Sequence, residues 1–455
     1  MQTPQTFPLH LPAHTPWARQ STRASLQTLI LLAGLHVPIG LLMDFSRAFA
    51  TLHALAVVAL GVRFATTPSR HAHAVYVCGY LASCDVLWRM SGARIFWETG
   101  KYALILILGL VMLQRGVRDG LGRWAVLYFA LLAPSSLLTI EYFGLSDDLR
   151  RALSFNLSGP LALAVAVICF SGWRGPLPDL SQLLRWMVLP VVSVFSIAAY
   201  STLTAGFISF SLHANFVTSG GYGPNQVSAV LGVGALMALL LGINTTQPPI
   251  RLAYLGMAAV FQLQSVLTFS RGGTFNVLIA TVFLGLHFIQ HRRARQIFIT
   301  ILGITLVVGA VAILPRLNAW TSGMLTERFT SFDTTGRQNL AEADLQLFKE
   351  HPLVGVGPGL SQRLRSDLYK RNVAAHTEYT RLLAEHGMLG LLALIILLLI
   401  VSQAYSLAPT ALSRGWVTCL AAWSMAEMAH SAMRIVAISF LFGLALLPFH
   451  RRGAP

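Results

Sequence analysis

The chain has 455 residues, of which 55% are hydrophobic and only 11% are charged. Soluble domains carry about 25% charged residues, so this composition excludes an ordinary soluble protein and indicates a polytopic membrane protein. The formal net charge is +16 at pH 7 and comes almost entirely from arginine. We expect no nucleic-acid partner, because no basic soluble domain is present, and part of the excess is expected to anchor cytoplasmic loops.

Apolar runs long enough to cross a bilayer, which takes about 20 residues, recur along the chain. They are continuously apolar rather than alternating with period two, which favours helices over a closed barrel. We expect spans near residues 25–43, 47–65, 74–90, 101–114, 124–141, 157–173, 185–207, 226–243, 251–269, 274–290, 297–314, 378–402 and 416–449. The last run is long enough for two helices with a turn near Ser431. The expected fold is therefore all-α, with about 12 and at most about 14 transmembrane helices.

Basic connectors predict how the chain is oriented in the membrane. Arg and His gather near Ser69, at 114–123, at 291–296 and at 450–452. Positive charge marks cytoplasmic loops, so we expect both termini in the cytoplasm. The expected organisation is a cytoplasmic tail at 1–24, a helical bundle at 25–314, one large outer loop with short helices at 315–377, C-terminal helices at 378–450 and a short cytoplasmic tail at 451–455. The first apolar run lacks a following small-residue cleavage site, so we expect it to be retained.

Two groups of ionisable residues fall inside the predicted spans. Asp85 and Arg89 are four residues apart, which predicts one helix face and an ion pair. Glu427, His430 and Arg434 are also spaced to share a face near the outer end of their span. Ionisable groups at membrane depth are candidates for function, and a purely structural role stays open for both groups.

The segment from Thr335 to Gly390 gathers Arg, Lys, Asp, Glu and His, and several motifs occur in and before it in a fixed order. SRGG at 270–273 follows an apolar span, and the loop then carries GR at 336–337 and HPLVGVGPG at 351–359. HTEY at 376–379 leads into EHGMLG at 385–390, which opens a long apolar run. Together with GPNQVSA at 223–229, this arrangement resembles the O-antigen ligase and polymerase superfamily, over about the C-terminal half of the chain. Thr377 stands where many relatives have Asn or Ser, and the loop at 211–224 offers His213 where some ligases have Arg.

The resemblance implies a GT-C-like glycosyltransferase of the bacterial inner membrane. Its donor would be a glycan on undecaprenyl diphosphate at the periplasmic face, and its acceptor, for a ligase, a sugar hydroxyl of lipid A-core. A neutral His has a pKa near the working pH, so His376 at the loop-to-helix boundary is the candidate base for the acceptor hydroxyl. Arg271 and Arg337 are the candidates to stabilise the departing diphosphate, because a guanidinium matches phosphate oxygens with two donors. Asn225, Glu378 and His213 are possible supporting residues.

Other prominent residues of these motifs have structural interpretations. We expect His386, Glu385 and Gly387 to serve helix packing, and the glycines of 355–359 to form a tight turn, since no strand precedes them and no Gly-Lys-Ser/Thr follows. The four cysteines all lie in apolar runs without metal-ligand spacing. No Asp-x-Asp pair stands out in the outer loops, so we expect no metal ion and no cofactor, with arginine supplying the positive charge.

The residues leave several functions open. An O-antigen polymerase would use a growing glycan as acceptor, and a protein O-oligosaccharyltransferase would use a Ser or Thr hydroxyl. From a different class, the chain could be a transporter or flippase of lipid-linked glycan. The sequence disfavours that reading, because no two-fold repeat of hydropathy with matched broken helices is apparent. A ligase is the favoured interpretation.

Overall fold

The computed structural model describes residues 26–117, 120–174, 177–287, 295–296, 299–300, 303, 307, 309–331, 337–369 and 375–448, with side chains described for all but 366–369. Within these residues the chain is helical and contains no strand. The N-terminal bundle consists of α1 (Leu26–Phe45), α2 (Arg47–Ala65), η1 (Pro68–Arg70), α3 (His71–Met90), α4 (Thr99–Arg115), α5 (Gly122–Leu132), α6 (Ser136–Phe143) and α7 (Asp147–Ser171). It continues with α8 (Leu180–Thr204), η2 (Val217–Ser219), α9 (Pro224–Asn244), α10 (Pro248–Leu267) and α11 (Arg271–Leu286).

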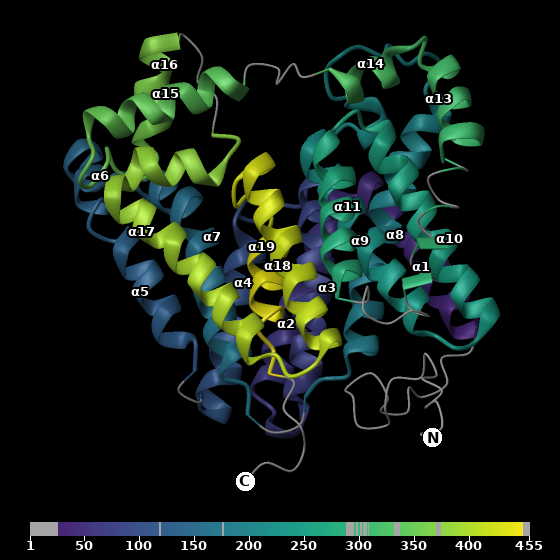
Figure 1. Cartoon of the computed structure of the whole chain (residues 1–455), viewed down its shortest axis with the longest axis horizontal. Coiled ribbons are helices and arrows are strands. Elements are labelled where there is room, and N and C mark those ends of the chain that lie inside the picture. The colour runs from purple at the N-terminus through teal and green to yellow at the C-terminus, as the bar shows by residue number, and fades with distance from the viewer. Residues whose placement is uncertain are drawn as a thin grey trace, which may run out of the picture.

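Short helices follow, and then the C-terminal helices. The short ones are η3 (Gly309–Ile313), α13 (Leu314–Trp320), α14 (Met324–Thr330), α15 (Arg337–Glu350) and α16 (Leu360–Tyr369). The last three are α17 (Glu378–Leu407), α18 (Ala411–Ser431) and α19 (Val436–Leu444). Helices α13 to α16 gather at one end of the bundle, the top in Figure 1, which we call the capped end.

The chain is a multi-pass membrane protein. Eight described helices are long and apolar enough to cross a membrane, namely α1, α2, α5 joined with α6, α7, α8, α9, α10 and α17. The shorter or more polar helices α3, α4, α11, α18 and α19 pack among them. These elements fall where the apolar runs predicted helices, and the run at 416–449 divides into two helices as expected, with α18 ending at Ser431. The span expected at 297–314 lies largely outside the described residues.

The centre of the bundle is built on close helix contacts and one buried ion pair. The middle of α3 is almost completely buried, because α2, α4 and α8 all pack against it. Asp85 pairs with Arg89 one turn later, and both side chains are at most 4% exposed. Gly100 of α4 makes room for this pair, since a Cβ there would lie 2.8 Å from the Asp85 carboxyl carbon. The predicted pairing of Asp85 and Arg89 is confirmed.

Helix α17 bends where the glycine loop at 355–359 docks against it. Gly387 interrupts the helix with a φ of 59° and a ψ of −138°. The carbonyl groups of Ala384 and Glu385 instead accept hydrogen bonds from Val356 and Gly357, both at 2.9 Å. Met388 donates back to the Pro352 carbonyl at 2.7 Å. The two glycine-rich motifs therefore interlock, and the expected tight turn also stabilises the bend of α17.

We predict that Gly355→Ala destabilises the protein strongly. Gly355 has a φ of 68°, and a Cβ there would lie 2.6 Å from the Ala384 carbonyl oxygen, where only backbone surrounds it. A positive φ and overpacking each carry a penalty, so we expect a loss of about 2–4 kcal/mol, seen as a lower thermal midpoint in detergent. Gly256→Ala is the matched control, because no atom lies within 4 Å of a Cβ in that helix. Equal midpoints for the two variants would contradict the interlocked arrangement.

Candidate functional site

The SRGG motif inserts the start of α11 between two other helices. Gly273 packs against α9, where its backbone N–H donates to the Ser228 hydroxyl at 3.2 Å. A Cβ on Gly273 would lie 2.6 Å from that hydroxyl oxygen. On the other side, a Cβ on Gly272 would lie 3.4 Å from the Cβ of His430 in α18. The two glycines thus let α11 approach both neighbours, and they place Arg271 at the capped end between α9 and α18.

Asn225 joins three of these segments through one side-chain oxygen. Its Oδ1 accepts a hydrogen bond from the Ser270 hydroxyl at 2.8 Å and another from the Arg337 guanidinium at 3.2 Å. The start of α9, the residue before α11 and the start of α15 therefore meet at Asn225. Arg271 donates to the backbone carbonyl of Ser331 at 2.6 Å. Arg271, Arg337 and Asn225, predicted from separate motifs, lie together.

His376 lies immediately before α17, as its place in the sequence predicts. Thr377 caps the helix, and its hydroxyl accepts from the backbone N–H of Tyr379 at 3.3 Å. The backbone carbonyl of His376 accepts from Ala432 at 3.1 Å, in the connection between α18 and α19. The imidazole is half-buried, and its Nδ1 is buried with no hydrogen-bond partner among the described residues. The backbone of His376 is thus fixed by a hydrogen bond to the connection between α18 and α19.

Arginines from several elements surround His376. Burial is the largest cause that lowers the pKa of His376, to about 3, and Arg434, Arg337 and Arg365 lower it further. Burial and the proximity of Arg271 also lower the pKa of Arg337, against an opposing contribution from Glu427. His376 is therefore a neutral imidazole at physiological pH, beside a cluster of positive charge suited to an anion. The arrangement places a neutral proton acceptor beside groups that can bind an anion.

The predicted triplet of Glu427, His430 and Arg434 is only partly on one face. Helix α18 ends at Ser431, and Ala432 leaves the helix with a φ of 51° and a ψ of −159°. Arg434 consequently lies beyond the helix end, so its expected position on the same face is wrong. Glu427 is buried and accepts hydrogen bonds from Asn276 of α11 and from Ser431. The spacing of four residues failed here because it assumed an unbroken helix.

The two other supporting candidates have their described contacts elsewhere. Glu378 is buried and forms an ion pair with Arg381 one turn later. His213 is exposed, and its described hydrogen bond joins its own backbone N–H to the Ser211 hydroxyl at 3.3 Å. No described contact brings His213 to His376 or to the arginines. His386 is fully buried, and its imidazole bonds to the Ser135 hydroxyl between α5 and α6.

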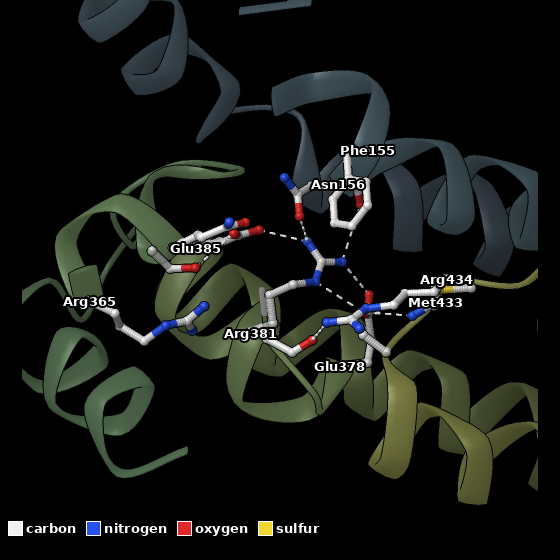
Figure 2. A pocket seen from close by; sticks show the side chains of 12 residues that line it. Phe155, Asn156, Arg365, Glu378, Arg381, Glu385, Met433 and Arg434 are labelled. Carbon is white, nitrogen blue, oxygen red and sulfur yellow. Dashed lines mark hydrogen bonds and ion pairs between the residues drawn. The ribbon is translucent and has the colours of Figure 1, made fainter. Parts of the chain in front are cut away.

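A small polar pocket is lined by Ala375 and Glu378, on either side of His376 in the sequence, together with residues from several other elements (Figure 2). Arg381 occupies its centre and donates to Glu385 at 2.6 Å and to the Asn156 side chain at 3.2 Å, while Arg365 and Arg434 reach it from two other elements. Its cavity of about 20 Å³ holds roughly one water molecule, so it is too small for a sugar ring. Arg365 and Arg381 were not predicted from the sequence as neighbours of the site, because neither belongs to a motif that marks it as functional.

Residues suited to metal binding do not cluster in the part of the chain that the structure describes. No group of three or more His, Cys, Asp or Glu side chains is arranged there to hold an ion. The side chains that converge at the capped end are mainly arginines, which are cations without a hydrogen-bond acceptor and do not ligate metal ions.

Comparison with known proteins confirms the resemblance drawn from the motifs. Residues 256–395 match the family model described as O-Antigen ligase, which indicates ligase- or polymerase-type function in a membrane glycosyltransferase-like superfamily. The matched segment includes SRGG, the glycine loop and the His376 motif, whereas Asn225 and Arg434 lie outside it. No curated protein matches the chain.

Proposed function

We propose that this protein is an O-antigen ligase of the bacterial inner membrane. It transfers a glycan from undecaprenyl diphosphate to a sugar hydroxyl of lipid A-core, with inversion and without a metal ion. Its site opens at the periplasmic face, where the lipid-borne donor and acceptor both arrive, and both termini lie in the cytoplasm. The observation that carries the proposal is the meeting of His376, Arg337 and Arg271 at the capped end.

The proposed reaction is a single displacement at the anomeric carbon. The acceptor oxygen attacks this carbon while the imidazole of His376 takes the hydroxyl proton. The bond from the anomeric carbon to the diphosphate oxygen breaks, and its electron pair leaves with the diphosphate. Attack opposite the leaving group inverts the configuration of the sugar.

Arginine supplies the charge stabilisation in this proposal. Negative charge on the diphosphate grows as its bond to the sugar breaks, so groups held in advance near it stabilise the transition state more than the ground state. Arg271 and Arg337 are held by Ser331 and Asn225 respectively, which limits the side-chain entropy lost on binding. Their guanidinium groups offer paired donors to phosphate oxygens.

Diphosphate binding also adjusts the base. Burial is the largest cause of the low pKa of His376 in the free protein, and Arg434, Arg337 and Arg365 lower it further. An anionic donor near these arginines offsets their charge, so the part of the lowering that the arginines cause is reduced and the pKa of His376 rises when the donor is bound. The imidazole therefore becomes a stronger base in the complex that needs it.

A transfer assay with the purified full-length protein tests this function. Radiolabelled lipid-linked glycan and lipid A-core are mixed with the protein in detergent, with and without excess EDTA. We expect new glycan–core linkages in both samples, because arginine takes the role that a divalent metal has elsewhere. A transporter would form no linkage, which separates the two classes. Activity that EDTA abolished and Mg²⁺ or Mn²⁺ restored would contradict the arginine-based mechanism.

A polymerase is the second candidate, because the family match covers ligase- and polymerase-type function alike. The lipopolysaccharide of a deletion strain distinguishes them. Loss of all capped core, with accumulation of lipid-linked polymer, indicates a ligase, whereas core that bears a single repeat indicates a polymerase. A protein O-oligosaccharyltransferase would instead modify a Ser or Thr peptide in the same detergent assay.

A further inference from the structure

The connection between α18 and α19, residues 432–435, holds the segment that carries His376. Ala432 donates its backbone N–H to the carbonyl of His376 at 3.1 Å. The Arg434 guanidinium donates to the carbonyl of Ala375 at 2.7 Å. Met433 donates its backbone N–H to the carboxylate of Glu378 at 3.3 Å. Three consecutive residues thus contact the chain on both sides of His376, so the position of the His376 backbone depends on the position of residues 432–435.

Helix α3 fixes that connection from the opposite side. Arg89 donates to the backbone carbonyl of Arg434 at 3.1 Å, and it also donates to the side chain of Gln226 in α9 at the same distance. Asp85 accepts from the backbone N–H of Val436 at 3.4 Å. The Asp85–Arg89 ion pair of α3 is therefore hydrogen-bonded to the backbone at the end of the connection, next to the start of α19.

Burial restricts the movement of the Asp85 and Arg89 side chains that hold this connection. The side chains of Arg89 and Asp85 are 4% and 3% exposed, and the Arg89 guanidinium lies 4.7 Å from the centre of the Trp97 ring. A buried charge that loses its partner remains unsolvated, so the pair has few alternative arrangements. The positive φ of Ala432 persists only where surrounding contacts impose it, which agrees with a connection held from both sides.

We propose that Asp85 and Arg89 are positioning residues for the transfer reaction, which act by holding residues 432–435 and through them His376. This inference rests on the catalytic role proposed for His376. It gives the ion pair of the N-terminal half a role in a site whose motifs lie in the C-terminal half. Arg89 and Asp85 touch neither donor nor acceptor in this arrangement.

A double-variant cycle in the full-length protein tests the proposal. Arg89→Gln is measured alone, His376→Ala alone, and the two together, each with the transfer assay and each normalised to folded protein. Displacement of a reacting group by about 1 Å can lower a rate about 100-fold, so we expect Arg89→Gln to lower kcat about 10-fold to 100-fold. We expect KM for the donor to change less than about 2-fold, because Arg271, Arg337 and Asn225 keep their contacts.

The informative comparison is in the His376→Ala background. If Arg89 acts through His376, Arg89→Gln there has less than about a 2-fold further effect on kcat, because the group it positions is gone. Equal fold-losses of kcat in both backgrounds, or no loss in the native background, would overturn the inference. If His376→Ala itself left kcat unchanged, the proposed function would fail instead, so the two failures are distinguishable.

Two further variants guard against a trivial loss of folding. Arg89→Lys keeps the positive charge opposite Asp85 and one donor group, so we expect a smaller loss of kcat than in Arg89→Gln. If Arg89→Gln is not recovered folded, Arg89→Lys replaces it in the cycle. Ser439→Ala is the matched control, since it removes a buried hydrogen bond of 3.0 Å between α19 and Gly159 of α7 without touching residues 432–435. We expect native kcat for Ser439→Ala, and a loss as large as that of Arg89→Gln would overturn the proposal.

Discussion

His376→Ala is expected to lower kcat by at least about 100-fold while the protein still inserts and folds. The imidazole is the only histidine side chain of the HTEY motif, and it lies at a helix start rather than in the packed core, so its removal leaves little cavity. General-base help contributes about 10²–10⁴ to a rate, which sets the lower limit of the expected loss. The measurement is initial transfer rate per folded protein. The remaining activity should rise with pH, because a more basic medium deprotonates the acceptor hydroxyl without the imidazole.

The pH profile of the native protein gives an independent readout of the same residue. His376 must be neutral to accept a proton, so activity is expected to fall as pH drops through its pKa. In the free protein that pKa is about 3, which places the acid limb of kcat/KM at low pH. Bound diphosphate offsets the arginines and raises the pKa, so the acid limb of kcat should lie at a higher pH than that of kcat/KM. Coincident limbs would show that the donor does not change the electrostatics of His376.

His386→Ala is the internal control for the histidine assignment. His386 is fully buried and bonds to Ser135, so its removal leaves a cavity and is expected to lower stability by about 2–3 kcal/mol. Activity per folded molecule should nevertheless remain close to native. If His386 were essential and His376 dispensable, the position of the base and the mechanism would both be wrong.

Arg271→Ala is expected to lower turnover by about 10²–10³, and Arg271→Lys by less, about 10-fold. Lysine keeps the positive charge but lacks the planar pair of donors that a phosphate accepts from arginine. Both variants should fold, because the close helix contacts of this motif are made by Gly272 and Gly273 rather than by Arg271. The measurement is kcat with both donor and acceptor at saturating concentration, and the thermal unfolding midpoint of each variant shows whether it is folded.

Arg363→Ala is the matched control for the loss of one arginine. Arg363 is about half exposed and pairs with Asp148 at 3.0 Å, and exposed pairs of this kind contribute little. It should therefore behave like the native protein. If Arg271→Ala and Arg271→Lys lose equal activity, the positive charge that lysine retains contributes nothing measurable, and only the geometry of the guanidinium matters. If both variants keep native activity, Arg271 does not belong to the site.

The sequence by itself determined the class of the protein, the approximate positions of the long apolar helices that the structure describes, and the order of its motifs. These properties are local: an apolar run of sufficient length must be helical in a bilayer, because its backbone groups find no other partners there. The same local logic placed His376 before a helix, where Thr377 serves as the cap. It also predicted the Asp85–Arg89 pair, whose members are only one turn apart.

Only the tertiary structure decided which distant segments meet at the site. Arg89 and the carbonyl of Arg434 are 345 positions apart, and Asn225 and Arg337 are 112 apart, so no spacing rule could relate them. The break of α18 at Ala432, which moves Arg434 off its predicted face and towards Ala375, likewise depends on contacts from other helices. The docking of the glycine loop on Gly387 has the same origin, because each motif leaves backbone groups that the other must satisfy. Local chemistry determines what each segment can form, and the packing of helices determines which of its groups face one another.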